Sequence, residues 1–280
     1  MKPSRLPAFV LFLLLFASSA GRADPLEDLE RAQQLLFERA AKSVVFIAAG
    51  DHFGSGFAVG DAGLILTNAH VVQGAKEVDV VLHDGTRIKA EVVEVARDSV
   101  DLALVQLPNA GPAGLDFDDT KDLRVGSWAA AIGHGLGGVW TYTTGMITNI
   151  YPAGRDRPVF QTQIPVNPGN SGGPVLDRKG RVIGVTTSKI EGASNVAFGI
   201  RIELALRVLE KMAATCSRCL VVRAPKNVPI LVDGQMLGQG PQLAFFAEKK
   251  SYTVMAIVAG QMRQKKVAFP AVRLVDLTVP

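Results

Sequence analysis

The feature that most restricts how this chain can fold is the segment PVNPGNSGGP at residues 165–174. Glycine loses much backbone freedom on folding and offers no side chain to pack, so this segment is expected to turn sharply rather than form a helix or strand. Such a turn exposes the hydroxyl of Ser171 and leaves backbone N–H groups uncovered beside it. A nucleophilic serine needs both features, although a surface turn with an incidental serine fits the segment equally well.

A serine becomes a useful nucleophile only beside a base, and the chain has four histidines: His52, His70, His83 and His134. His70 is the best placed, because it follows the apolar run of residues 64–66 and would stand just past a buried strand. Asp101 opens a second apolar run, where an acid is costly to bury unless its charge is needed. The other three histidines are expected to be ordinary loop and turn residues.

The order of these residues separates two fold classes. Residues 169–173 read GNSGG and fit the G-x-S-x-G turn of α/β-hydrolases, but that fold requires its histidine after the serine. No histidine follows Ser171. The order His70, Asp101, Ser171 instead predicts an all-β fold, a double β-barrel of the chymotrypsin type.

The distribution of apolar runs agrees with two barrels. Short runs separated by Gly, Asp and Asn turns cover residues 44–107, with a hairpin signal at Asp84-Gly85, and a second set of strands covers 123–200. The stretch 108–122 is rich in Pro, Gly and Asp and is predicted to link the barrels. Helices are expected at 24–43 and at 202–214, the second closing a protease domain of residues 44–214.

Five segments in order resemble trypsin-like serine proteases of the HtrA/DegP kind over residues 44–212. They read GSGFAV (54–59), LTNAHVV (66–72), DLALVQL (101–107), AIG (131–133) and NPGNSGGPVLD (167–177). The resemblance implies that His70 is the general base, Asp101 its orienting carboxylate and Ser171 the nucleophile. It also implies an oxyanion hole formed by the backbone N–H groups of Gly169 and Ser171, with Asn170 between them.

The same resemblance locates the pocket for the substrate side chain before the cut. Its expected lining is Pro165, Thr186, Thr187, Ser188 and Phe198. These residues carry no charge, so we expect a small aliphatic side chain there. The chain departs from the family at Gln163, where Asp is usual, and at Gly133-His134-Gly135, which replaces Gly-Asn-Pro.

Residues 1–23 are predicted to be a signal peptide. Lys2 and Arg5 precede an apolar stretch at 8–17, and small residues follow it. The stretch is too short to span a bilayer comfortably, and we expect a periplasmic or secreted protein with no stable membrane insertion after cleavage. Removal of this segment leaves 27 basic against 26 acidic residues, so we see no electrostatic case for nucleic acid as a partner.

The last part of the chain, residues 215–280, is expected to form a small β domain. Cys216 and Cys219 are predicted to form a disulfide at its start, since disulfides are the usual state of cysteine pairs in exported proteins. Residues 229–241 and 251–261 resemble the β-sandwich module called PEGA, with a hairpin signal at Asp233-Gly234. No carboxylate-binding loop of a PDZ domain, usual at this position in HtrA-like proteases, is found.

These observations predict an exported serine endopeptidase that acts on polypeptides, including envelope or unfolded proteins. Scattered histidines and two cysteines supply no structural zinc site, and no cofactor is implied. The alternative is a non-catalytic or latent scaffold with a protease fold that binds envelope proteins or polymers. The N-terminal helix either docks on the barrels or builds contacts in a homo-oligomer.

Overall fold

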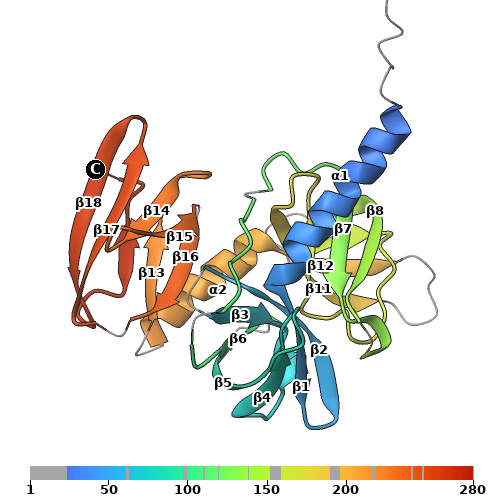
Figure 1. Ribbon diagram of the computed structural model, residues 1–280, viewed down its shortest axis with the longest axis horizontal. Coiled ribbons are helices and arrows are strands. Elements are labelled where there is room, and N and C mark those ends of the chain that lie inside the picture. The colour runs from blue at the N-terminus through green and yellow to red at the C-terminus, as the bar shows by residue number, and fades with distance from the viewer. Residues whose placement is uncertain are drawn as a thin grey trace, which may run out of the picture. The chain divides into compact units, whose positions relative to one another are not determined.

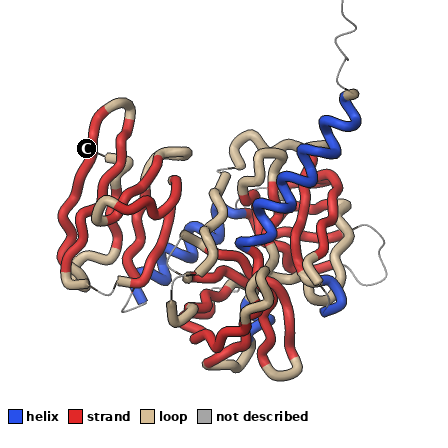
Figure 2. Tube along the Cα trace, in the orientation of Figure 1, coloured by secondary structure: helices blue, strands red, loops and turns tan. Residues whose placement is uncertain are grey.

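The computed structural model of the chain is built mainly of β-strands (Figure 2). It describes the following residues: 24–60, 63–96, 100–109, 111–118, 120–137, 139–151, 159–189, 196–215, 219–240, 242–247 and 249–279. The predicted signal peptide lies outside these ranges. None of the helices in the described ranges is both long and apolar enough to cross a membrane.

The first helix, α1 (Pro25–Ala40), begins as the sequence indicates. Asp24 caps it, because its carboxylate accepts the backbone N–H of Leu26, and Pro25 occupies the first helical position, where no N–H is required. A short 3₁₀ turn (Ala41–Ser43) follows. In the last turn of α1, the ring of Phe37 packs edge-on against Tyr142, so this end of the helix joins a hydrophobic core.

The first barrel closes in the strand order β1-β2-β3-β6-β5-β4 (Figure 1). Its strands are β1 (Val44–Ala49), β2 (His52–Ala58), β3 (Leu64–Thr67), β4 (Glu77–Val81), β5 (Arg87–Val95) and β6 (Ala103–Gln106). The predicted hairpin at Asp84-Gly85 joins β4 to β5, and Gly85 has the positive φ of 86° that such a turn favours. Small and β-branched side chains fill the interior, among them Val45, Ile47 and Val105.

The second barrel closes in the order β10-β11-β12-β9-β8-β7. Its strands are β7 (Trp128–Gly133), β8 (Thr141–Ile150), β9 (Val159–Thr162), β10 (Pro174–Leu176), β11 (Val182–Lys189) and β12 (Ala197–Arg201). Helix α2 (Ile202–Thr215) follows β12 directly. The all-β double barrel predicted from the order of His, Asp and Ser is therefore confirmed.

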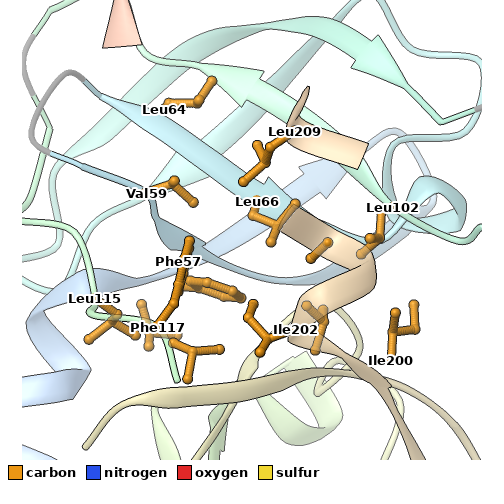
Figure 3. Close-up of a cluster of buried hydrophobic side chains, with 14 of the residues drawn as sticks. Phe57, Val59, Leu64, Leu66, Leu102, Leu115, Phe117, Ile200, Ile202 and Leu209 are labelled. Carbon is orange, nitrogen blue, oxygen red and sulfur yellow. The ribbon is translucent and has the colours of Figure 1, made fainter. Parts of the chain in front are cut away.

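A buried cluster joins the two barrels (Figure 3). Phe57 and Leu66 enter it from the first barrel, Ile200 from the second and Leu209 from α2. The predicted linker also takes part, since Leu115 and Phe117 are buried there and Phe117 forms an isolated bridge with Val182. Part of the Pro/Gly-rich segment is therefore packed into the core, although other positions, such as Asn109 and Ala113, are exposed.

The remaining strands form two sheets that share a separate hydrophobic cluster. One sheet has the order β16-β13-β19, and the other has the order β15-β14-β17-β18. These strands are β13 (Cys219–Arg223), β14 (Pro229–Val232), β15 (Gln235–Gln239), β16 (Gln242–Phe246), β17 (Ser251–Val258), β18 (Gln261–Ala268) and β19 (Leu274–Asp276). The hairpin predicted at Asp233-Gly234 joins β14 to β15 and is confirmed. Cys216 and the side chain of Cys219 lie outside what the structure describes, so their disulfide stays a prediction.

Candidate active site

His70 and Asp101 meet at one end of the first barrel. His70 lies in the 3₁₀ turn Ala69–Val72 that follows β3, and Asp101 stands just before β6, the strand paired with β3. Two hydrogen bonds connect the residues: the His70 backbone N–H donates to Oδ1 of Asp101 (3.0 Å), and Nδ1 of the ring lies 2.7 Å from Oδ2. Because a carboxylate only accepts hydrogen bonds, Nδ1 carries the proton and Nε2 is the free acceptor.

The carboxylate of Asp101 is held in its charged form by these donors. Burial raises its pKa, but hydrogen bonds from the ring and backbone of His70 and from the hydroxyl of Thr187 (2.8 Å) outweigh burial, so the pKa of Asp101 lies below its usual value. The side-chain amide of Asn68 also donates to the backbone carbonyl of Asp101 at 2.7 Å. The pair is thus a rigid base with an ionised partner.

Ser171 lies in the turn that precedes β10, and this turn is fastened to both barrels. The backbone N–H of Ser55, on β2, donates to the carbonyl of Ser171 at 2.8 Å. Gly172 donates to the carbonyl of Thr186 on β11, and Thr186 donates back to Gly173, both at 2.9 Å. The loop therefore has a fixed position opposite His70 and Asp101, although it belongs to the other barrel.

The side chain of Ser171 does not hydrogen-bond to His70 in the described part of the chain. Its Oγ donates instead to the carbonyl oxygen of Thr187 at 3.0 Å. The backbone N–H groups of Gly169 and Ser171 donate to nothing within the described residues. An oxyanion hole needs N–H groups without protein partners beside the nucleophile, so these two donors remain the predicted pair.

Thr187 connects the two halves of this site because of an irregularity in β11. The pairing of β11 with β12 runs from Thr186 opposite Gly199 to Ser188 opposite Phe198, which leaves Thr187 as the extra residue of a β-bulge. Bulges commonly re-aim a side chain next to an active site. Here the Thr187 hydroxyl reaches Asp101 and its carbonyl reaches Ser171.

The residues predicted to line the substrate pocket occupy different environments. Pro165 is exposed, Thr186 is buried and Phe198 is half-buried beside Tyr151, with ring centroids 6.4 Å apart. The side chain of Ser188 lies outside the described atoms. The pocket assignment stays a prediction.

The sequence did not indicate which residues contact the loop that holds Ser171. His134, expected to be an ordinary loop histidine, is 1% exposed, and its ring contacts the buried hydroxyl of Ser55. The replacement of Gly-Asn-Pro by Gly133-His134-Gly135 was the available signal. No group of three or more potential metal ligands occurs among the described residues.

Comparison with known proteins decides the nature of the region that holds these residues. Residues 54–185 match the family model of the trypsin-like peptidase domain. This region is a trypsin-like peptidase domain. The DegP-like periplasmic serine endoprotease of Halomonas elongata is 39% identical over 165 residues, which cover 57% of this chain and 35% of that protein. The serine protease HhoA of Synechocystis is 36% identical over 58% of this chain and 43% of its own length. The chain thus spans less than half the length of these relatives.

Solved structures agree on the fold of the peptidase domain. The serine endoprotease of Yersinia pestis superposes with a TM-score of 0.60 at 23% identity and covers 84% of this chain and 96% of its own, a likeness that concerns the fold alone. The inactive form of Rv3671c from Mycobacterium tuberculosis gives a TM-score of 0.58 at 27% identity over 69% of this chain and 95% of its own. The resemblance to HtrA-type proteases is therefore confirmed for the barrels, whereas the PEGA-like reading of the last strands stays a prediction.

Proposed function

We propose that the protein is an exported serine endopeptidase in which Ser171 is the nucleophile, His70 the general base and Asp101 the orienting carboxylate. The observation that carries the proposal is that Thr187 bonds both to Asp101 of the His70–Asp101 pair and to Ser171, in a turn where the Gly169 and Ser171 N–H groups have no partner among the described residues. A scaffold that only binds other proteins has no use for this combination of an ionised carboxylate, a free imidazole nitrogen and unpaired donors.

The reaction begins with a rotation of the Ser171 side chain away from the carbonyl of Thr187 and toward Nε2 of His70. The Oγ atom attacks the carbonyl carbon of a peptide bond while Nε2 takes its proton. Gly169 and Ser171 donate their N–H groups to the negative oxygen of the tetrahedral intermediate, which then breaks its C–N bond as His70 returns the proton to the leaving amine. Water hydrolyses the resulting ester by the same steps.

A labelled fluorophosphonate probe tests the proposal directly, because it reacts only with activated serines. The purified protein should be labelled and should hydrolyse an unfolded protein, and Ser171→Ala should abolish both. Absence of labelling in a folded wild-type protein, or labelling that survives Ser171→Ala, would show that the proposed function is wrong.

The substrate preference follows from the uncharged residues proposed to line the pocket: Pro165, Thr186, Thr187, Ser188 and Phe198. An Arg or Lys side chain would lose its hydration there without a counter-ion, whereas removal of a Val, Ala, Ile or Leu side chain from water is favourable. Discrimination among those four should be weak, about 1–3 kcal/mol per methylene. Cleavage sites mapped by mass spectrometry in an unfolded protein should therefore follow small aliphatic residues, and sites clustered after Arg and Lys would exclude this pocket.

Export and the periplasmic or extracellular setting belong to the same proposal. They are supported by the charged and apolar pattern of residues 1–23 and by the periplasmic description of the Halomonas relative. Envelope or unfolded proteins are the substrates that this setting offers. Fractionation of cells that express the full chain, with the amino terminus of the recovered protein sequenced, would test it.

A further inference from the structure

The carbonyl of Gly169 is hydrogen-bonded by a residue of the first barrel. Its oxygen accepts the hydroxyl hydrogen of Ser55, on β2, with the two oxygens 2.7 Å apart, and Ser55 is fully buried. This carbonyl belongs to the Gly169–Asn170 peptide, which lies between the Gly169 and Ser171 N–H groups that have no partner among the described residues. Fixing this peptide limits rotation about the backbone bonds of Gly169 and Asn170 on either side, and so restricts the directions in which those two groups can point.

Ser55 is itself held by His134. The backbone N–H of His134 donates to the Ser55 oxygen at 3.0 Å, and Nδ1 of the ring lies at 3.0 Å from the same atom. A hydroxyl group has one hydrogen to donate and two lone pairs to receive donors. Since the Gly169 carbonyl can only accept, it takes the hydroxyl hydrogen, and Nδ1 must then carry a proton and donate it to Ser55. The ring is thus protonated on Nδ1.

The surroundings of the ring keep it neutral. Phe46 from β1 and Trp140 pack against it, with ring centroids 5.4 and 4.4 Å away, and His83 lies across Trp140 with centroids 5.2 Å apart. No charged side chain faces the ring among the described residues, and its Nε2 atom is buried there without a hydrogen bond. Burial lowers the pKa of His134 to about 4, so the ring is uncharged at neutral pH.

The same loop is tied down on its other side. The carbonyl of Pro168 accepts the backbone N–H of Leu136 at 2.7 Å, so both peptides that flank Gly169 are anchored. Gly169 has a φ of 100°, and a Cβ atom there would overlap the carbonyl oxygen of His134. Only glycine therefore fits at position 169 against the backbone of His134.

From this geometry we infer that Ser55 and His134 are positioning residues for the oxyanion hole. Nδ1 and the backbone N–H of His134 orient the Ser55 hydroxyl, the hydroxyl fixes the Gly169 carbonyl, and the Gly169 and Ser171 N–H groups consequently face the attacked carbonyl of the substrate. The inference rests on the proposed function for its effect on catalysis. The proton arrangement itself does not depend on activity.

Kinetics with a peptide substrate test the catalytic consequence. Without the hydroxyl, the Gly169 carbonyl is buried unpaired and its peptide can turn, so Ser55→Ala should lower kcat about 100-fold, the scale of losing one oxyanion donor. KM should stay within about threefold, because the oxyanion forms only in the transition state. His134→Phe keeps the ring shape but loses the Nδ1 donor, and should lower kcat about tenfold, as expected for one hydrogen bond.

His134→Asn is the matched control, because its side-chain amide N–H can take the place of Nδ1–H. It should keep kcat within about threefold of the wild type, with thermal unfolding showing that all three variants are folded. Equal losses in His134→Asn and His134→Phe, or a Ser55→Ala variant with unchanged kcat or altered KM alone, would overturn the inference.

Nitrogen NMR of the histidine rings tests the proton arrangement whether or not the protein is active. In the wild type, one ring besides that of His70 should be protonated on Nδ1 and unchanged between pH 8 and pH 5, and His134→Asn should remove its signals. In Ser55→Ala, the proton of this ring should no longer be confined to Nδ1. A His134 ring protonated on Nε2 would contradict the inference, because Ser55 would then donate to the ring instead of to Gly169. An unlabelled, inert wild type with the expected NMR signals would refute the proposed function and leave the arrangement standing.

Discussion

The base half and the nucleophile half of the site differ in how far they are assembled. His70 and Asp101 are joined through both the ring and the backbone, and Thr187 and Asn68 add two further donors around Asp101. Ser171 has a backbone anchored just as firmly, but its hydroxyl is turned to the carbonyl of Thr187. For the proposed reaction, the base is already paired with its carboxylate, whereas the nucleophile first has to leave the carbonyl of Thr187.

This difference shows where a barrier to activity lies. In the proposed reaction the Ser171 side chain has to turn away from Thr187, whereas the N–H groups of Gly169 and Ser171 already lack partners among the described residues. Rotation of an exposed or half-buried serine takes place in picoseconds to nanoseconds. The resting position of Ser171 should therefore cost little in rate, and the two halves should act as one unit once substrate is bound.

The largest expected effect comes from removal of either reacting group. Ser171→Ala and His70→Ala should each lower kcat by about 10⁵–10⁶-fold, and the double variant should be little worse than either single one, because residues that share one step do not contribute additively. Steady-state kinetics with one peptide substrate would measure kcat for all three variants. Losses that multiply in the double variant would show that the halves work independently.

Asp101→Asn should have the next largest effect. Both oxygens of Asp101 accept hydrogen bonds from His70, whereas the amide replaces one of them with an N–H donor and favours the wrong tautomer of His70, so kcat should fall by about 10⁴-fold while the fold is kept. The pH–rate profile of the variant, measured beside the wild type, distinguishes this role from a structural one. A variant that keeps the wild-type kcat would show that His70 does not need Asp101 for catalysis.

Thr187→Val probes the bulge that connects the two halves. Valine matches threonine in shape but removes only the hydroxyl bond to Asp101, while the backbone carbonyl that holds Ser171 remains. We expect kcat to fall about tenfold, the value of one hydrogen bond to a charged group. Thr148→Val, on β8 and with no hydrogen bond from its hydroxyl among the described residues, is the control and should have a much smaller effect on kcat.

The smallest effect concerns acid stability. The pKa of Asp101 is lower in the folded protein than in the unfolded chain, so its stabilisation is present above the unfolded value, about 3.9, and is lost as pH falls through the folded value. The melting temperature of the wild type should exceed that of Asp101→Asn at pH 7, and the gap should narrow below pH 4. A gap independent of pH would mean that the carboxylate contributes through shape alone.

The double barrel and the His70–Asp101 contact could be predicted because both depend on patterns local in sequence. Each residue adjoins a run of apolar residues, and the two runs prove to be neighbouring strands, β3 and β6. The roles of Thr187 and Ser55 could not be predicted in this way. Thr187 acts through a bulge that alternation does not reveal, and Ser55 acts on a carbonyl 114 positions away along the chain. The burial of His134 likewise depends on Trp140 and Phe46, which only the tertiary fold brings to it.

The burial of Leu115 and Phe117, between the two barrels, has a consequence for the resistance of the chain to proteolysis. A Pro/Gly-rich connection is normally where proteins are nicked, because a protease needs an extended stretch of chain with free backbone groups. Here the chain beside the two buried residues is already paired: Leu115 donates to Ala58, and Asp118 and Asp116 are bonded to Val182. A protease would have to pull residues 115–118 out of the core before cutting them. We therefore expect this part of the connection to resist cleavage, so that a cut between the barrels would fall at exposed positions such as Asn109 and Ala113.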